Sequence, residues 1–562
     1  MKFSNVMRFA RTISYLKSIQ LVCRLTFNLY RPQPEVTPAP RLRPTLKKWK
    51  LPYRRKATMI TSSTFSFFGD TCDVRKEGWD NPKYSKLLRY NLHYFDDLNA
   101  IDSQERTEWH KSIIISWIES NPPAQGTGWE PYPLSLRLVN WIKWIQENKQ
   151  YLDSHMLHSM AIQVRHLNNR IEWHLLGNHL FVNAKALIFA GMFFEGKEAN
   201  KWLKKGMAIL AKQVPEQILK DGGHFELSPM YHSLAVEDLL DLINIINQYD
   251  ADPTNDTLDL LEEWESVVHR MFRWLELMCH PDGEISFFND SALNIAPSKE
   301  ALARYSERLG IALSPCKNIN LHRLDNSGYY IISKYDCYAI IDVAEIGPSY
   351  LPAHAHADTL SFEMSLFGER LVVNGGTSEY GTGEERQRQR GTAAHSTLSL
   401  LDASKETINS SEVWGGFRVG RRANVKLLNI NKTSQKVIVE ASHNGYKYLN
   451  AGLMVCRNWE LTRNRMTITD LVKGRNKFDS IIRYHLHPEI SVTQEESGII
   501  KLTLPNSLKV VSLVEKNGMP INVVGSTWHP EFGASINSKS LEIDVPNHSL
   551  KTVTVIFDWN EN

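Results

Sequence analysis

One stretch in the first half of the chain is dense in amide and imidazole side chains. In WHLLGNHLFVN (173–183), Asn178 and His179 stand among apolar residues that would suit an ordinary buried helix. Removing such a polar group from water costs about 1–3 kcal/mol unless it finds a partner. The ordinary explanation is a hydrogen-bonded polar patch inside the fold. The alternative is a ligand site, which requires other segments to converge on these residues.

A second stretch, DGGHFELSPMYHS (221–233), contains a helix-start signature. Ser228 followed by Pro229 is typical of a hydroxyl N-cap and a proline at the first helical position. Tyr231 would then lie in the first turn, where a substrate can reach it and where free N–H groups favour an anion. The structural alternative for Tyr231 is a packing residue at the helix entry.

A third stretch brings together histidines and arginines. His354 and His356 are two residues apart, so on an extended chain before a strand they face the same way. This spacing suits metal ligands, or a base with a supporting histidine. Downstream, Arg386 and Arg390 precede His395, and guanidinium groups beside a histidine suit carboxylate or sulfate recognition. The alternative is a solvated charged loop.

Bulk properties limit the classes of function. A chain of 562 residues is expected to form two or more domains, and 42% hydrophobic with 23% charged residues is ordinary for globular proteins. The net charge of +3 gives no global field for nucleic acid, so an acidic ligand needs a local basic site. Six scattered cysteines without a CxxC pair argue against a disulfide framework or a thiolate zinc site. Motifs for nucleotide binding and serine hydrolysis do not occur.

The hydrophobic period divides the chain in two. From about residue 80 to 310, apolar residues recur every three or four positions, and after about 318 the period becomes two. We therefore expect a helical bundle, solenoid or toroid followed by an antiparallel β-sandwich. The segments with the helical pattern are 133–147, 155–168, 179–193, 199–212, 231–247 and 259–278.

The N-terminal segment is basic. Residues 1–56 carry fourteen Lys or Arg and one Glu, with apolar residues at helical spacing and a Pro-rich, extended connector at 31–44. This pattern fits either contact with an anionic membrane surface or, slightly preferred, a basic helix docked on the rest of the chain. No apolar run is long enough to span a bilayer, and the signal-peptide pattern is not clean. The expected location is cytoplasmic or membrane-associated, with the periplasm as the alternative.

Several motifs in order resemble the heparinase II/III family of polysaccharide lyases, which includes oligoalginate lyases. The motifs are LRYNLHYFDDL (88–98), GWEPYPLSLRLVNWIKW (128–144), NHLFVNAKAL (178–187), DGGHFELSPMYHS, HAHADTLSFEMSLFGERLVVNGGTSEYG (354–381) and TAAHSTLSL (392–400). The resemblance covers roughly residues 60 to 560. It implies an α+β multidomain chain, with a basic N-terminal segment and connector (1–56), an incomplete (α/α) toroid (57–315) and an antiparallel β-sandwich (316–562).

The resemblance also implies a chemistry for the polar residues. Lyases of this family break a 4-linked uronide by β-elimination in the cleft between the two domains. Asn178, helped by His179, would neutralise the C6 carboxylate, as an oxyanion site does. Tyr231 and His354 match the residues that take H5 and protonate the leaving O4. Which residue does which depends on the configuration at C5, and one phenol can do both in a syn elimination.

The remaining site residues follow from the same motifs. Candidate substrate-binding residues are Glu226, Tyr380, Arg386 and Arg390. In family members a metal, usually zinc, is held at the positions of His356, Asn374 and His395. Asn374 is neutral and a poor zinc ligand, so occupancy by zinc or another divalent ion with a structural role stays open. Without metal, the two histidines would brace the site through hydrogen bonds.

Three functions compete. The first is lyase action on an anionic, uronate-containing polysaccharide or oligosaccharide, with no nucleic-acid partner. The second is C5 epimerisation, which begins with the same proton abstraction but returns the proton to the other face. The third is a non-catalytic glycan-binding protein of capsule or exopolysaccharide production. Only the lyase yields an unsaturated uronate that absorbs in the ultraviolet.

Overall fold

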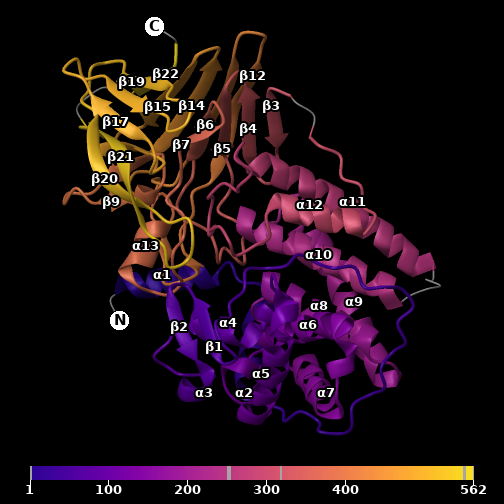
Figure 1. The fold of residues 1–562 in the computed structure, drawn as a ribbon. Coiled ribbons are helices and arrows are strands. Elements are labelled where there is room, and N and C mark those ends of the chain that lie inside the picture. Colours follow the sequence, from indigo (N-terminus) through magenta and orange to yellow (C-terminus); the bar gives the residue numbers. More distant parts are fainter. Residues whose placement is uncertain (1–2, 250–254, 317–318, 548–551, 561–562) are drawn as a thin grey trace.

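The computed structural model describes residues 3–249, 255–316, 319–547 and 552–560. Helices prevail up to residue 308, and antiparallel strands prevail from residue 321 onward (Figure 1). The predicted change of period near residue 318 is therefore confirmed. The chain from 31 to 41 forms neither helix nor strand, as expected of the Pro-rich connector.

All six segments with a helical period are helices. The helices of the first half are α1 (Phe3–Ile13), α2 (Ser18–Leu29), α3 (Val74–Glu77), α4 (Lys86–Tyr94), α5 (Thr107–Ser120), α6 (Pro131–Glu147), α7 (Ser154–Asn169), α8 (Gly177–Phe193), α9 (Lys197–Gln217), α10 (Pro229–Tyr249), α11 (Asn255–Met278) and α12 (Lys299–Arg308). A small hairpin of β1 (Thr64–Phe67) and β2 (Asp70–Asp73) precedes α3. The helical pattern did not predict this hairpin, which turns at Phe68 and Gly69, both with positive φ.

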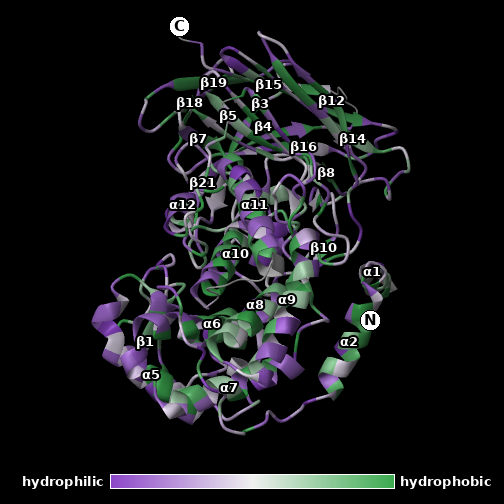
Figure 2. Cartoon of the chain, turned by 90° about the vertical axis from the view of Figure 1, so that its right-hand side faces the viewer, coloured by the Kyte–Doolittle hydropathy of each residue, from purple (hydrophilic) through white to green (hydrophobic). Residues whose placement is uncertain are grey.

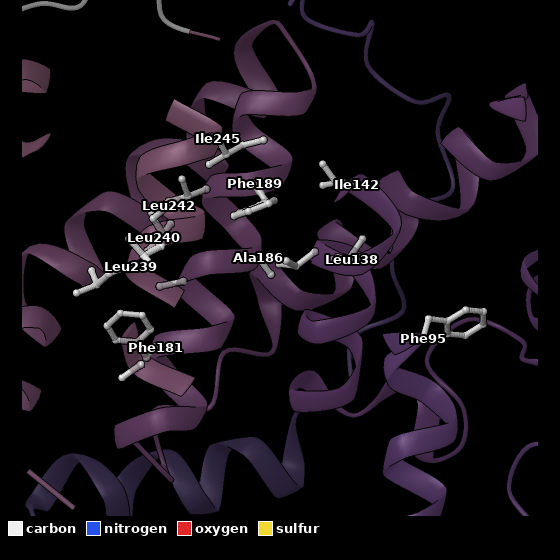
Figure 3. Packing of buried hydrophobic residues seen from close by; sticks show 14 of the residues in the cluster. Phe95, Leu138, Ile142, Phe181, Ala186, Phe189, Leu239, Leu240, Leu242 and Ile245 are labelled. Carbon is white, nitrogen blue, oxygen red and sulfur yellow. The ribbon is translucent and has the colours of Figure 1, made fainter. Parts of the chain in front are cut away.

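Helix α8 is the centre of the helical half. Apolar residues surround its whole circumference, and Phe181 and Phe189 pack among side chains of α6 and α10, such as Leu138 and Leu242 (Figure 3). A helix buried on every side must pair its few polar groups. Lys185 accordingly binds the carboxylates of α10, with Nζ 2.6 Å from Asp238 Oδ1. This packing fixes the N-terminal end of α8, where Asn178 lies.

The strands form three larger sheets, and paired strands within each sheet are antiparallel. The strands of the first sheet are, in spatial order, β3 (Leu321–Leu324), β4 (Tyr329–Lys334), β5 (Cys337–Asp342), β6 (Phe362–Leu366) and β7 (Glu369–Val372). The eight-stranded sheet has the order β12 (Val425–Lys432), β13 (Val437–His443), β14 (Met454–Thr462), β15 (Arg465–Lys473), β22 (Thr552–Asp558), β19 (Val510–Glu515), β18 (Ile500–Thr503) and β17 (Ser491–Gln494). The third sheet has the order β20 (Asn522–Trp528), β21 (Ile536–Val545), β16 (Ser480–His485), β8 (Leu398–Leu401) and β9 (Thr407–Ile408). One apolar core unites them, with Ile332, Trp459 and Ile543 from different sheets.

The two halves meet through both apolar and polar contacts. Trp274 and Met278 of α11 share an apolar cluster with Tyr329 and Ile331 of β4. The loop between α11 and α12 also reaches the second half, because the Asp290 N–H donates to the carbonyl of His354 at 3.0 Å. Residues far apart in sequence are thereby brought to one place.

The structure defines two local features that the sequence left open. His354 and His356 lie in a loop before β6. Backbone N–H groups of this loop bind atoms outside the strands instead of pairing with a neighbouring strand. The His356 N–H, for example, donates to Asn289 Oδ1 at 3.1 Å. The arginine-rich stretch forms helix α13 (Glu384–Arg390), and Arg386 and Arg390 are buried in it, so it is no solvated loop.

A buried ion pair fixes the loop before β6 to the eight-stranded sheet. Arg457 of β14 binds Asp470 of β15 through two hydrogen bonds of 2.8 Å, and Arg457 Nη1 donates to the carbonyls of Leu360 and Ser396.

We predict that Arg457→Met lowers the free energy of unfolding by about 3–5 kcal/mol, because Asp470 stays buried and unpaired. Denaturant unfolding measures this. The double variant Arg457→Met/Asp470→Leu should lose less free energy of unfolding, because it leaves no unpaired carboxylate. An equal loss in both variants would contradict this explanation.

Candidate active site

The three predicted catalytic residues converge where α8 and α10 begin and the loop before β6 approaches them. The rings of Tyr231 and His354 stack with centroids 3.9 Å apart. The start of α8 touches the same place, since a Cβ on Gly177 would lie 2.2 Å from Leu351 Cδ2 and 3.1 Å from Glu226 Oε1. Asn178 is the next residue of the helix. Residues from both halves thus form one cluster.

Tyr231 lies in the first turn of α10, as the Ser-Pro signature predicts. Its N–H donates to Ser228 Oγ at 3.2 Å, and its hydroxyl is 2.9 Å from the hydroxyl of Tyr380. Burial raises the pKa of both phenols well above their usual value. Both phenols are therefore protonated at neutral pH, and Tyr231 is equipped to donate a proton.

His354 is oriented by a buried carboxylate. Its Nδ1 lies 2.9 Å from Asp290 Oδ2, so Nδ1 carries the proton of this hydrogen bond. The other ring nitrogen, Nε2, lies 3.3 Å from Glu226 Oε2. The imidazole thus presents Nε2 to the interior of the cluster, as a histidine that exchanges protons requires.

Asp290 holds more than one residue of the site. Its second oxygen accepts from His356 Nε2 at 2.8 Å, and Arg386 binds both carboxylate oxygens. Burial opposes the ionisation of Asp290, but Arg386 and the two histidines outweigh it and hold its pKa well below the usual range. Asp290 was not among the residues predicted from the sequence. The available signal was an acidic residue at the end of the apolar run ISFFND.

Arg386 and Arg390 are buried beside the site. Arg386 is engaged by Asp290 and by the Gly416 carbonyl, and Arg390 donates to the Ala355 carbonyl at 3.0–3.1 Å. The structure gives both residues a positioning part, since they hold Asp290 and the loop that carries His354. Direct contact of either guanidinium with a substrate stays a prediction.

Asn178 and His179 form the second part of the site, together with two residues that sequence reasoning missed. Asn178 Nδ2 donates to the Tyr132 hydroxyl at 3.2 Å, and the His179 ring packs on the Tyr132 ring with centroids 4.5 Å apart. His179 Nδ1 lies 3.1 Å from Glu172 Oε2. Burial disfavours the imidazolium, but Glu172 outweighs burial and raises the pKa of His179. An amide donor and a histidine disposed to be cationic therefore stand together.

An aromatic residue borders the cluster on the outer side. Phe417 lies in the turn between β10 (Val413–Trp414) and β11 (Arg418–Val419), and 42% of it is exposed. Its ring centroid is 5.8 Å from that of His354 and 5.1 Å from that of Tyr380. A partly exposed ring beside polar catalytic groups offers an apolar surface for the face of a sugar. No motif or spacing in the sequence marks Phe417.

The predicted metal residues also lie together. The rings of His356 and His395 have centroids 5.3 Å apart, and His395 Nδ1 is 3.1 Å from Asn374 Oδ1. Within the part of the chain that the structure describes, His356 Nδ1 and His395 Nε2 are buried without a hydrogen-bond partner. Burial lowers the pKa of both histidines, that of His356 to about 4, so both rings are neutral. The same described residues contain no group of three His, Cys, Asp or Glu that could hold a metal ion.

Comparisons with known proteins agree on one family. A model of the heparinase II/III N-terminus matches residues 82–309, and a model of the heparinase II/III-like C-terminal region matches residues 317–556. The heparin-sulfate lyase of Bacteroides stercoris is 26% identical over 409 residues, which are 62% of this chain and 58% of that protein. The heparin-sulfate lyase of Pedobacter heparinus is 27% identical over 245 residues, 40% of this chain and 36% of that protein. The matched region of this chain thus spans 58% of the length of the first relative and 36% of the length of the second.

Solved structures show the same fold. The crystal structure of heparinase III has a TM-score of 0.67 and 18% identity, and the match covers 87% of this chain and 81% of that chain. The heparan sulfate lyase of Pedobacter heparinus has a TM-score of 0.60 and 17% identity, covering 89% and 82%. These likenesses support a helical N-terminal region followed by a C-terminal region of antiparallel sheets.

The environment of Glu226 predicts an unusual pH dependence of stability. Burial raises the pKa of Glu226 above its usual value, although His354 and His179 oppose the shift. As the pH rises, the unfolded chain loses this proton first, so Glu226 destabilises the folded protein above its usual pKa. We predict that Glu226→Gln raises the melting temperature at pH 7 and leaves it unchanged at pH 4. An equal effect at both pH values would contradict this reasoning.

Proposed function

The chain belongs to the heparinase II/III family, and we propose that it is a polysaccharide lyase that cleaves a uronate-containing anionic glycan by β-elimination. One observation carries the proposal. Tyr231 stacks on His354, which is held by Asp290, and this pair adjoins the start of α8, where Asn178 lies. An acid, a base and a carboxylate-binding amide are the groups that such an elimination needs.

In the proposed mechanism, Asn178 and His179 bind the C6 carboxylate of the uronate. The Asn178 amide donates to it, and a protonated His179 supplies positive charge, which Glu172 stabilises. Removing H5 pushes charge from C5 into this carboxylate, so the donors bind the transition state more tightly than the ground state. This step would lower the barrier to proton abstraction.

His354 then acts as the base and Tyr231 as the acid. Asp290 keeps the proton on His354 Nδ1, which leaves Nε2 to take H5. The C4–O4 bond breaks, a double bond forms between C4 and C5, and the protonated Tyr231 hydroxyl transfers its proton to O4. The raised pKa of Tyr231 supports this assignment, because the phenol is protonated at neutral pH and has a proton to give.

The finer architecture belongs to the same proposal. We infer that the helical half closes as an incomplete (α/α) toroid and that the sheets stack as a sandwich, as in the family. The glycan would then lie between the halves, where Phe417 offers a surface for a sugar ring and Tyr380 orients Tyr231. The two curated lyases named above act, by their names, on heparin sulfate, which is an acidic polysaccharide.

A structural metal is a further part of the proposal. His356 Nε2 faces Asp290 and His395 Nδ1 faces Asn374 Oδ1, so the opposite nitrogens carry the lone pairs. These lone pairs are buried and unpartnered among the described residues. Two neutral imidazoles fit a weak site for zinc or a similar divalent ion, and Asn374 Oδ1, which binds His395 Nδ1 in this structure, would become a third ligand only if the His395 ring turned over. When bound, the ion would brace the loop that carries His354.

We predict lyase activity that depends on the Tyr231 hydroxyl. Incubation with a panel of acidic polysaccharides should produce the ultraviolet absorbance of an unsaturated uronate. Tyr231→Phe should lower the rate about 100- to 10,000-fold, and Asn178→Ala about 100- to 1,000-fold, with little change in melting temperature. Tyr338→Phe, which removes a phenol bound to the Leu277 carbonyl away from the site, is the matched control.

Two results would contradict the lyase proposal. Unimpaired turnover in Tyr231→Phe would remove the tyrosine from the mechanism. Exchange of H5 with solvent on a panel polysaccharide, without new ultraviolet absorbance, would indicate epimerisation instead, because that reaction shares only the first proton transfer.

We predict weak zinc binding that an introduced carboxylate strengthens. Zinc should raise the melting temperature of the protein slightly, that of Asn374→Asp clearly more, and that of His395→Ala not at all. Metal analysis of protein purified without chelator measures occupancy directly. A zinc effect that survives in His395→Ala would place any bound metal elsewhere.

A further inference from the structure

The first two helices carry a concentration of exposed apolar side chains. We call α1 and α2 the N-terminal helix pair. Large hydrophobic residues of this pair that are 40% exposed or more are Val6, Met7, Phe9, Ile19, Leu21, Val22, Leu25 and Leu29. Figure 2 shows both helices at the edge of the molecule, with hydrophobic residues along them. Contiguous apolar surface of this kind marks a site of interaction.

Helix α1 is fixed to the β half through its polar side. Arg8 and Arg11 both bind the carboxylate of Glu412, and Thr12 accepts from Trp414 Nε1 at 3.1 Å. These residues lie on one side of α1, because residues three and four apart share a helix face. The opposite side, with Val6 and its exposed apolar neighbours, faces outward.

Helix α2 is fixed in a similar manner to both halves. Gln20 is buried and donates to the Tyr350 carbonyl at 3.4 Å, and the Phe27 ring packs on His174 with centroids 4.1 Å apart. At about 100° per residue, Gln20 and Phe27 lie on one side of α2, and Val22, Leu25 and Leu29 lie on the opposite side. Leu29 is 84% exposed. The helix therefore docks through its less apolar side.

The charge around this apolar surface identifies its occupant. The sequence has no Asp or Glu before Glu35. Arg8 and Arg11 bind Glu412, and Lys17 binds Glu216, whereas Arg24 and Arg31 form no ion pair with an acidic side chain among the described residues. Arg24 and Arg31 are exposed. Positive charge flanking an outward apolar helix face is complementary to a bilayer that contains anionic lipids.

We propose that the N-terminal helix pair docks this protein on an anionic lipid surface, with Val22, Leu25 and Leu29 entering the interface. The contact is peripheral, because no helix among the described residues is long and apolar enough to cross a membrane. The helix pair lies outside the regions matched by the two family models, which begin at residues 82 and 317. The docking is therefore separate from the proposed lyase chemistry and does not depend on it.

Vesicle co-sedimentation of the full chain tests the proposal. The protein should bind vesicles of phosphatidylcholine with 30% phosphatidylglycerol and should bind pure phosphatidylcholine far less, with binding to the anionic vesicles weakened by salt (about 0.5 M). Val22→Ser/Leu25→Ser/Leu29→Ser should lower the partition coefficient at least about tenfold. The matched control replaces three exposed apolar residues of the β half by serine, namely Leu508, Val510 and Ile536, and should bind as the wild type does.

Three outcomes would overturn the proposal. The first is the absence of wild-type binding to anionic vesicles. The second is equal binding by the triple variant of α2, with an unchanged melting temperature as proof of folding. The third is a wild-type dimer that becomes monomeric in the triple variant, measured by light scattering, because a second copy would then be the occupant.

Arg24→Gln/Arg31→Gln, which keeps the apolar face, should weaken binding to anionic vesicles only.

Discussion

The candidate site depends on the buried carboxylate of Asp290. This one side chain, from the loop between α11 and α12, binds His354, His356 and Arg386 of the β half. A carboxylate removed from water is costly unless it is paired and fully hydrogen-bonded, and Asp290 meets both conditions only when the two halves are in register. The interaction therefore does more than orient an imidazole. It couples the geometry of the site to the assembly of the two halves, so that a misplaced half would leave several buried charges unmatched.

Burial also sets the chemical character of the groups around this carboxylate. Tyr231 and Tyr380 stay protonated because their surroundings disfavour a phenolate, whereas His179 is drawn toward its cationic form by Glu172. His179 holds this opposite tendency although its ring contacts that of Tyr132, a phenol whose pKa burial also raises. Such separation of pKa values is how a protein places an acid, a base and a cation side by side at neutral pH.

The sequence allowed the broad plan and part of the site to be predicted. Hydrophobic periods of 3.6 and 2 residues are local properties of the chain, so the helices of the first half and the strands of the second could be predicted. Ser228 and Pro229 likewise predicted that Tyr231 lies in the first turn of a helix. Asp290 and Tyr132 were missed because their significance lies in partners about 64 and 46 residues away. His354 precedes a strand, as expected, but its loop conformation could not be predicted for the same reason, since Asn289 of a distant loop binds the backbone of His356.

The contact between α1 and Glu412 has a consequence for the order of folding. Arg11 and Glu412 are 401 residues apart. At about 5–20 residues per second, a ribosome needs roughly 20–80 s to synthesise the chain between them. During that interval the first helix has no docking partner in the β half, and both its basic side and its apolar side remain open to solvent, chaperones or lipid. The turn that carries Phe417 is consequently among the last parts of the site to be tied down, and helix α1, although made long before it, reaches its final place only then.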